Sequence, residues 1–188
     1  MIAPIDVSNT VIKTERLTLR PWRLKDLDDL YEYARDPQVG PNAGWPPHES
    51  RDTSVMILLK FIEEKKTFAI EYEGKVIGSI GVERFEEERF PQLREKKCRE
   101  LGFVLARPYW GRGLMPEAVD AVVKWLFEEN GLDAILCGHF LFNGRSARVQ
   151  EKCGFTHLDF GSVTTATGTH EDEMTILWRE DWELKNSK

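Results

Sequence analysis

Gly111 and Gly113 carry the clearest chemical signal of this sequence, in a stretch that runs from Glu100 to Ala121 (ELGFVLARPYWGRGLMPEAVDA). Glycine adopts positive φ without steric cost, so successive N–H groups in such a turn can converge on one anion. Pro116 suits a first helical turn, because the N–H that proline lacks would be unpaired there. Free N–H groups and the helix dipole favour negative charge at this end. The spacing predicts a phosphate-binding turn, although a plain tight connection would use the same glycines.

The residues on both sides of the turn support this prediction. Residues 101–106 form a short apolar run without charge, which predicts a strand buried on both faces. After the turn, Val119, Val122, Val123 and Leu126 recur at the spacing of one apolar helix face. The turn has no G-K-[ST] sequence and no third glycine spaced for a dinucleotide, so a different phosphate ligand is expected.

The remaining pattern predicts a mixed α/β domain around one sheet. Asp26 is placed to cap the first helix, and Glu73-Gly74 is typical of a hairpin turn. The residues 40–47 form a loop that contains Trp45, and the charged residues 86–97 form a connection. The predicted strands are 11–20, 67–72, 75–85, 101–106, 134–140, 155–163 and 173–182, and the predicted helices lie between Asp26 and Asp36, at 51–64, between Pro116 and Gly131, and at 143–153.

The composition describes an ordinary soluble protein of one domain, residues 1–188. Of these residues, 41% are hydrophobic and 31% are charged. The net charge of -6 argues against nonspecific binding of nucleic acid and suits cationic or amine substrates. The N-terminus lacks a signal-peptide pattern and no window approaches 18 consecutive apolar residues, so a cytoplasmic location without membrane contact is expected.

The three cysteines, Cys98, Cys137 and Cys153, are odd in number and far apart in the sequence. They indicate neither a disulfide framework nor a CxxC site. Cys137 and His139 share a predicted strand face, but two ligands do not make a zinc site. No metal is therefore expected, and the cysteines are predicted to pack as small hydrophobic residues.

Two segments resemble known sequence motifs at the expected separation. ELGFVLARPYWGRGLMPEAV is similar to an acetyl-CoA loop, and NGRSARVQEKCGF is similar to the signature N-x-x-S-x-R-V-x-E-K-x-G-F. Both motifs belong to the GNAT N-acetyltransferase superfamily, in the branch of the ribosomal-protein N-terminal alanine and serine acetyltransferases. The resemblance covers nearly the whole chain. It implies an α/β fold with a mostly antiparallel sheet of about seven strands, flanked by about four helices, whose central strands splay to form an acetyl-CoA cleft.

The resemblance also implies how acetyl-CoA is bound. Backbone N–H groups of the loop would hold the pyrophosphate, and the edge of the preceding strand would pair with the pantetheine amides. Asn143 resembles the asparagine that bonds the pantetheine arm, and it is equally suited to cap the next helix. Arg148 and Lys152 would either meet the 3′-phosphate or remain solvated. The side chain of Arg112 would add a charged contact. The implied cofactor-binding residues are Phe103, Val104, Leu105, Gly111, Arg112, Gly113, Leu114, Met115 and Asn143.

Two positions of the acetyl-CoA loop depart from the broader pattern [QR]-x-x-G-x-[GA]. Trp110 stands at its first position and Met115 at its last. Because backbone N–H groups need no particular side chain, the departure affects only side-chain contacts.

For catalysis, the resemblance implies direct attack of an amine on the thioester in a ternary complex. Glu100 stands where some members place a general base, and Glu83 is a weaker rival on the preceding strand. The N–H of Val104 is expected to face the thioester oxygen. Gln150 occupies the place of the tyrosine that many relatives use as acid, which leaves Ser146 as the candidate acid. The plainer alternatives are a salt-bridged Glu100 and a Ser146 that bonds local backbone.

The acceptor is the open question. Trp45 lies in the loop that covers the acceptor site in this superfamily, where it would line the amine pocket or pack on its own loop. A protein N-terminal α-amine is the first expectation. Acetylation of a small amine, such as an amino sugar, polyamine or antibiotic, and a catalytically silent CoA-binding module are the alternatives. Relatives are often dimers, so a homodimer is a further expectation.

Overall fold

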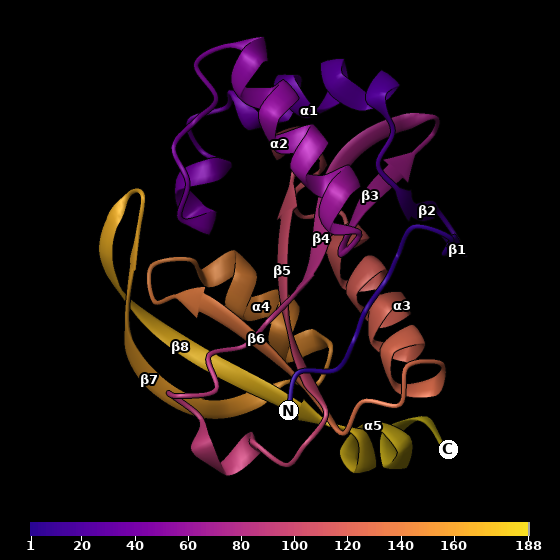
Figure 1. Ribbon diagram of the computed structural model, residues 1–188, viewed down its shortest axis with the longest axis vertical. Helices are drawn as coiled ribbons and strands as arrows, with labels where there is room; N and C mark the ends of the chain where they lie inside the picture. The colour runs from indigo at the N-terminus through magenta and orange to yellow at the C-terminus, as the bar shows by residue number, and fades with distance from the viewer. Residues whose placement is uncertain (188) are drawn as a thin grey trace.

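The computed structural model describes residues 1–187, which form one eight-stranded sheet with helices on both faces (Figure 1). Its strands are β1 (Ile12–Lys13), β2 (Leu17–Pro21), β3 (Thr67–Tyr72), β4 (Lys75–Glu83), β5 (Cys98–Leu105), β6 (Ala134–Phe140), β7 (Thr156–Thr165) and β8 (Gly168–Trp178). Its α-helices are α1 (Leu27–Ala34), α2 (Arg51–Glu64), α3 (Leu114–Glu128), α4 (Gly144–Lys152) and α5 (Arg179–Asn186). The predicted fold class is confirmed.

The strand order is β1-β2-β3-β4-β5-β6-β8-β7, and the strands pair antiparallel except β5 with β6. The parallel pairing of β5 and β6 extends only from Cys98–Leu101 against Ala134–Cys137. Beyond Leu101 the two strands separate, while β5 continues to pair with β4 as far as Leu105. The predicted splay is thus present, and it leaves one edge of β5 without a neighbouring strand.

Both faces of the sheet are covered by apolar residues. On one face α3 buries Val119, Val122, Val123 and Leu126, each at most 1% exposed, as their spacing predicted. On the other face α1 and α2 cover one end of the sheet, and the 86–97 connection covers the other. All three cysteines are buried, in agreement with their predicted role. In the part of the chain described, no helix has the length and apolar character to cross a bilayer.

Three local predictions are wrong in detail. The predicted strand 11–20 is two strands, because Thr14 turns the chain and its Oγ1 accepts a hydrogen bond from the N–H of Leu17. Asp26 does not cap α1, because its carboxylate pairs with the buried guanidinium of Arg20 at 2.8 and 2.9 Å. The predicted strand 173–182 ends at Trp178, where α5 begins.

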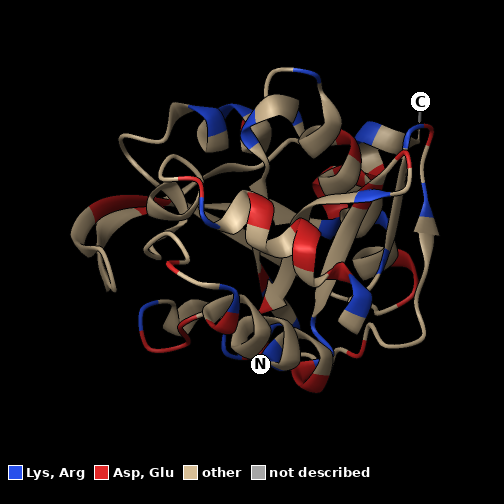
Figure 2. Ribbon diagram, turned by 90° about the horizontal axis from the view of Figure 1, so that it is seen from above, with Lys and Arg blue, Asp and Glu red and all other residues tan. Residues whose placement is uncertain are grey.

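The last hairpin is longer than its sequence predicted. β8 begins at Gly168, and its residues before 173 are polar because this end of the hairpin projects beyond the sheet (Figure 1). Viewed from above, acidic and basic residues are interspersed over the fold (Figure 2).

Candidate active site

The loop between β5 and α3 has the geometry that its glycines predicted. Gly111 and Gly113 are left-handed, with φ of 72° and 74°. A Cβ at Gly111 would meet no atom within 4 Å, so the backbone conformation rather than crowding requires glycine there. α3 begins at Leu114, earlier than expected, which puts Pro116 at its third residue. Because first-turn N–H groups have no partner inside the helix, those of Leu114 and Met115 are available to an anion.

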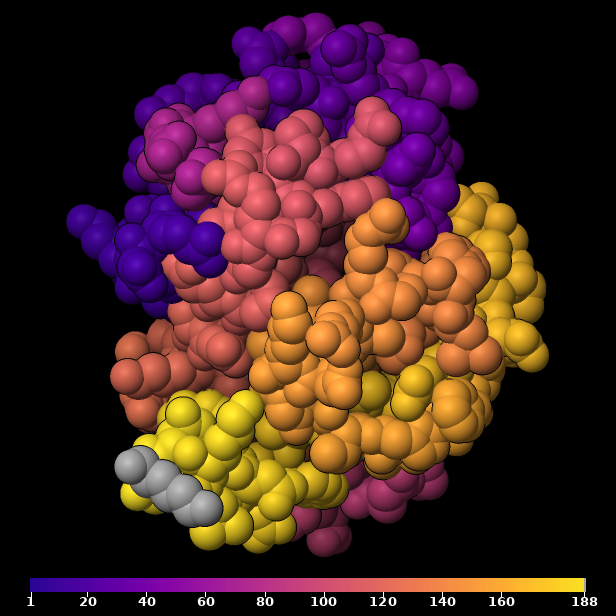
Figure 3. Space-filling view, turned by 180° about the vertical axis from the view of Figure 1, so that it is seen from behind, coloured from indigo at the N-terminus to yellow at the C-terminus, as the bar shows by residue number. Residues whose placement is uncertain are grey.

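A cavity of about 450 Å³ lies between this loop and α4. Seen from behind, the molecule is hollowed between the salmon segment that contains the loop and the orange segment that contains α4 (Figure 3). The end of β5 and the connection between α1 and α2 complete its walls. The predicted site residues that line it are Phe103, Val104, Leu105, Gly111, Gly113, Leu114, Met115, Asn143 and Ser146. The fold thus assembles most of the predicted donor site in one place.

The unpaired edge of β5 presents alternate backbone groups to this cavity. The N–H of Ala106 donates to the carbonyl of Ile77 on β4 at 2.7 Å. Alternate residues of a strand direct their backbone groups to the same side, so Val104 also directs its N–H toward β4. Phe103 and Leu105 direct theirs toward the gap. Val104 therefore directs its N–H away from the gap, against the expectation that it faces the thioester oxygen, and Phe103 is the neighbouring residue whose N–H faces the gap.

The contacts of Trp110 explain why a tryptophan can stand at the first position of the family pattern. Its Nε1–H donates to the carbonyl of Leu105 at 2.7 Å, so the indole occupies one acceptor of the strand edge. The guanidinium of Arg145 lies 4.3 Å from the centre of the indole ring, and Arg145 lines the cavity. Arg145 was not among the site residues that the sequence predicted. Its spacing from Arg148 and Lys152, which also line the cavity, would have placed three cations on one face of α4.

Arg112 does not occupy the predicted position. Its guanidinium donates to the hydroxyl of Tyr72 at 2.9 Å and lies over the rings of Tyr72 and Tyr109. Among the described residues that line the cavity, the cations are those of α4, and Arg112 is not one of them. Stacking on two aromatic rings holds this side chain away from the anion site, so the predicted side-chain contact is wrong.

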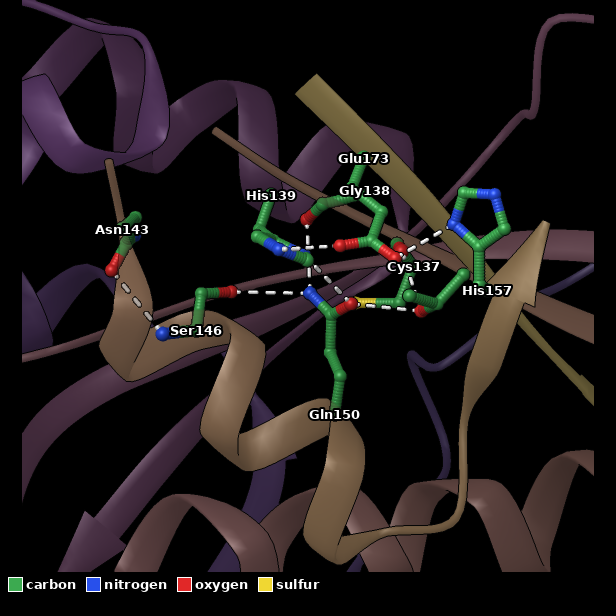
Figure 4. Close-up of polar contacts among 9 residues, drawn as sticks. Cys137, Gly138, His139, Asn143, Ser146, Gln150, His157 and Glu173 are labelled. Carbon is green, nitrogen blue, oxygen red and sulfur yellow. Dashed lines mark hydrogen bonds and ion pairs between the residues drawn. The ribbon is translucent and has the colours of Figure 1, made fainter. Parts of the chain in front are cut away.

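Ser146 and Asn143 lie at the start of α4 (Figure 4). Asn143 Oδ1 accepts a hydrogen bond from the N–H of Ser146 at 3.2 Å, so the capping role of Asn143 is confirmed. Its Nδ2 donates to the carbonyl of Asn42, which ties α4 to the connection between α1 and α2. The Ser146 hydroxyl accepts from Gln150 Nε2 at 3.2 Å. Ser146 therefore faces the cavity and is held from behind by Gln150.

Glu100 and Glu83 lie opposite each other on β5 and β4, outside the residues that line the cavity. The next pair on this face is Gly81 with Gly102, and Gly138 of β6 lies beside Glu100, whose Oε1 would be 3.6 Å from a Cβ there. Gly102 is exposed although it belongs to a central strand, and a Cβ on it would meet no atom within 4 Å. The two carboxylates therefore border a surface of bare backbone next to the gap between β5 and β6.

The two carboxylates differ in their surroundings. Burial, followed by the repulsion of Glu83, raises the pKa of Glu100 from 4.5 to about 7. Glu83 instead forms an ion pair with Lys66, with Oε2 and Nζ 2.6 Å apart. A carboxylate with a pKa near neutrality suits proton transfer better than a salt-bridged one, so Glu100 remains the stronger candidate.

Trp45 does not line the cavity. Its ring packs so closely on Gly40 that a Cβ there would come within 2.4 Å of it, and it lies 5.3 Å from the ring of His48. This contact agrees with the interpretation that Trp45 packs on its own loop, whereas its place in the amine pocket stays a prediction. Other residues of the connection between α1 and α2 line the cavity, namely Val39, Asn42 and Ala43.

Sequence comparisons are consistent with this site. Residues 16–156 match the family model described as "Acetyltransferase (GNAT) domain". The chain is 30% identical over 129 residues to the "Uncharacterized N-acetyltransferase p20" of Bacillus licheniformis, covering 65% of the chain and 68% of that protein. It is 32% identical over 114 residues to the "FsC-acetyl coenzyme A-N(2)-transacetylase" of Aspergillus fumigatus, covering 58% of the chain but only about half, 48%, of that protein.

Solved structures share the fold. A GNAT-family acetyltransferase from Bacillus anthracis superposes with a TM-score of 0.79 at 23% identity, covering 91% of the chain and 99% of that protein. The ribosomal-protein-S5-alanine acetyltransferase from Vibrio fischeri gives 0.71 at 21% identity, covering 93% and 99%. At these identities the likeness speaks for the fold alone and not for a branch of the family. Together with the match to the family model, the geometry of the loop and strand edge shows that this chain belongs to the GNAT acetyltransferases and is an acetyl-CoA-dependent acyltransferase.

Proposed function

We propose that this protein transfers the acetyl group of acetyl-CoA to a primary amine by direct attack within a ternary complex. The observation that carries the proposal is the unpaired edge of β5 next to the left-handed Gly111 and Gly113 loop, both of which line one cavity. A thioester with a long amide-containing arm and a pyrophosphate has the groups that such an edge and such a loop would bind.

The donor would be held mainly by backbone groups. The N–H groups from Gly111 to Met115 would bind the pyrophosphate, and the C=O of Phe103 with the N–H of Leu105 would pair with the pantetheine amides. Arg145, Arg148 and Lys152 supply positive charge on the opposite wall of the cavity, where further phosphate oxygens of CoA would be neutralised.

In the reaction, the amine nitrogen forms a bond to the acetyl carbon and the bond from that carbon to sulfur breaks. The nitrogen loses a proton and the departing thiolate gains one, so a base and an acid are needed at the two ends. Glu100 would take the proton of the amine, and Ser146 would protonate the thiolate. The N–H of Phe103 would stabilise the negative charge that develops on the carbonyl oxygen.

The acceptor would approach the bare backbone at Gly102, which Glu100 and Glu83 border. Acidic side chains at this position favour an amine over an acidic acceptor. A protein N-terminal α-amine is our first candidate, since an extended peptide fits a surface without side chains. The relative named as an N(2)-transacetylase of FsC favours a small amine as the second candidate.

The test is a thiol-release assay with acetyl-CoA over peptides, amino sugars and polyamines, with every product confirmed by mass. Transfer to peptide N-termini but not to free small amines supports the first candidate, and the reverse pattern supports the second. Binding of acetyl-CoA without transfer to any amine would instead indicate a silent CoA-binding module. Failure to bind acetyl-CoA would contradict the proposal as a whole.

A further inference from the structure

Gln150 is the most completely bonded polar side chain near the cavity. It is 1% exposed, and its amide contacts four partners from α4, β6 and β8 (Figure 4). Nε2 donates to the carbonyl of Gly138 and to Ser146 Oγ, each at 3.2 Å. Oε1 lies 2.8 Å from Thr175 Oγ1 and 3.1 Å from His139 Nδ1. These contacts use both hydrogens of the amide, and Oε1 has two neighbours, although the single hydrogen of Thr175 is shared with the carbonyl of Cys137 at 2.9 Å.

The partners fix which way the amide faces. The carbonyl of Gly138 can only accept a hydrogen bond, so the NH₂ group of Gln150 must lie on that side. Its second hydrogen is then directed at Ser146 Oγ, and Oε1 is directed at His139, whose Nδ1 must carry hydrogen. The opposite ring nitrogen of His139, Nε2, lies 3.4 Å from Glu173 Oε2. The direction of the Gln150–Ser146 hydrogen bond is therefore set by groups on two strands.

This direction determines where the hydrogen of Ser146 points. A hydroxyl that accepts from Gln150 cannot donate back to it, and within residues 1–187 the structure gives that hydrogen no other acceptor. Ser146 lines the cavity, so its O–H is free to donate into it. The same N–H of Gln150 would stabilise the negative oxygen that Ser146 becomes after giving up its proton.

We propose that Gln150 is a positioning residue that holds the Ser146 hydroxyl with its hydrogen directed into the cavity. This inference rests on the proposed function. In the step concerned, the Ser146 O–H bond breaks and its proton passes to the departing thiolate. The serine oxygen then recovers a proton from water, and the proton that Glu100 took from the amine, released to solvent, neutralises the hydroxide that remains. Gln150 gives up no proton in this step, because an amide N–H is too weak an acid. It acts through Ser146 alone.

A double-mutant cycle with Ser146→Ala and Gln150→Met tests this dependence. Methionine has a similar length and no donor. We expect kcat to fall about 100-fold for Ser146→Ala and about 10-fold for Gln150→Met, with the KM for acetyl-CoA within about twofold. The double variant should be no slower than Ser146→Ala. A double variant slower by the product of the two effects would overturn the proposal.

Gln150→Glu keeps the shape of the side chain and replaces the donor with an acceptor, which makes it the second route if Gln150→Met does not fold. Ser146 would then turn its hydrogen toward the carboxylate, so kcat should fall and should recover in part as the new carboxyl is protonated at lower pH. A kcat for Gln150→Glu that equals the wild type at every pH would contradict the role.

Thr175→Val is the matched control, because it removes a buried bond to the same amide without touching Nε2. It should lower the melting temperature and leave kcat within about threefold. A loss of kcat equal to that of Gln150→Met would show a general structural role and overturn the inference. The two proposals fail differently: a wild type without transfer contradicts the proposed function, whereas an active wild type with an additive cycle contradicts only the role of Gln150.

Discussion

The cavity has two facing walls, one formed by the end of β5 and the loop before α3 (the loop wall) and the other by α4 (the α4 wall). Backbone groups supply the functional atoms of the first wall, and side chains supply those of the second. On the loop wall, the backbone of Gly111, Gly113 and Phe103 lines the site, and its geometry follows from φ and from strand register. On the α4 wall, the groups are side chains such as Ser146 and Arg145. A backbone site tolerates changes of side chain, as Trp110 illustrates, whereas a side-chain site depends on every partner that orients it.

The largest expected effect concerns the α4 wall. Ser146→Ala removes the hydroxyl that faces the cavity and should lower kcat about 100-fold, because protonation of the thiolate would lose its donor. Steady-state kinetics with both substrates measure this effect, and the KM for acetyl-CoA should change by less than about twofold. A selective rise in that KM with an unchanged kcat would assign Ser146 to donor binding instead.

Glu100 is the second side chain with a proposed catalytic role, and its pKa predicts how kcat/KM depends on pH. With a pKa of about 7, the carboxyl is mostly protonated at lower pH and cannot accept the proton of the amine. Log kcat/KM should rise with pH toward 7 and level off above it, and Glu100→Gln should abolish this rise and lower the plateau about 30-fold. An unchanged pH profile in Glu100→Gln would assign the base to another group.

The same carboxyl links stability to pH. Between pH 4.5 and about 7 the folded protein keeps a proton on Glu100 that the unfolded chain has lost, so the free energy of unfolding should fall as pH rises through this window. The fall is at most about 3 kcal/mol, from a shift of this size. Denaturant unfolding at pH 5 and pH 8 measures it, and Glu100→Gln should show a smaller difference between the two pH values than the wild type.

The same contrast explains how far the sequence could predict the site. Glycine spacing, the Pro116 position and apolar periodicity are local signals, so they predicted the loop, the strand before it and α3. The splay of that strand was implied only by the family resemblance. Arg112 was misplaced because its conformation depends on Tyr72, which is distant in sequence. From the sequence, Gln150 was noted only as the residue that replaces the tyrosine of many relatives. Its role could not be predicted because its partners Gly138 and Thr175 lie on strands that are distant in sequence. Partners of this kind are known only once the fold is known.

The loop wall should respond to backbone geometry and not to side-chain chemistry. Gly113→Val forces a β-branched residue to a φ of 74°, and the resulting strain or rearrangement should weaken acetyl-CoA binding about tenfold in a calorimetric titration. Gly131→Val is the matched control, because Gly131 also has a positive φ of 64° with no atom within 4 Å of a Cβ, and it lies after the far end of α3. Equal loss of affinity in both variants would attribute the effect to general destabilisation.

The smallest effect on catalysis should come from Trp45, which belongs to neither wall. Because its ring packs on Gly40 and His48 outside the cavity, Trp45→Ala should leave the KM of each accepted amine within about twofold and lower the free energy of unfolding by about 1–2 kcal/mol, less than a fully buried tryptophan would. Steady-state kinetics and denaturant unfolding separate the two quantities. A selective rise in acceptor KM would instead make Trp45 part of acceptor recognition, in the connection between α1 and α2 whose other residues line the cavity.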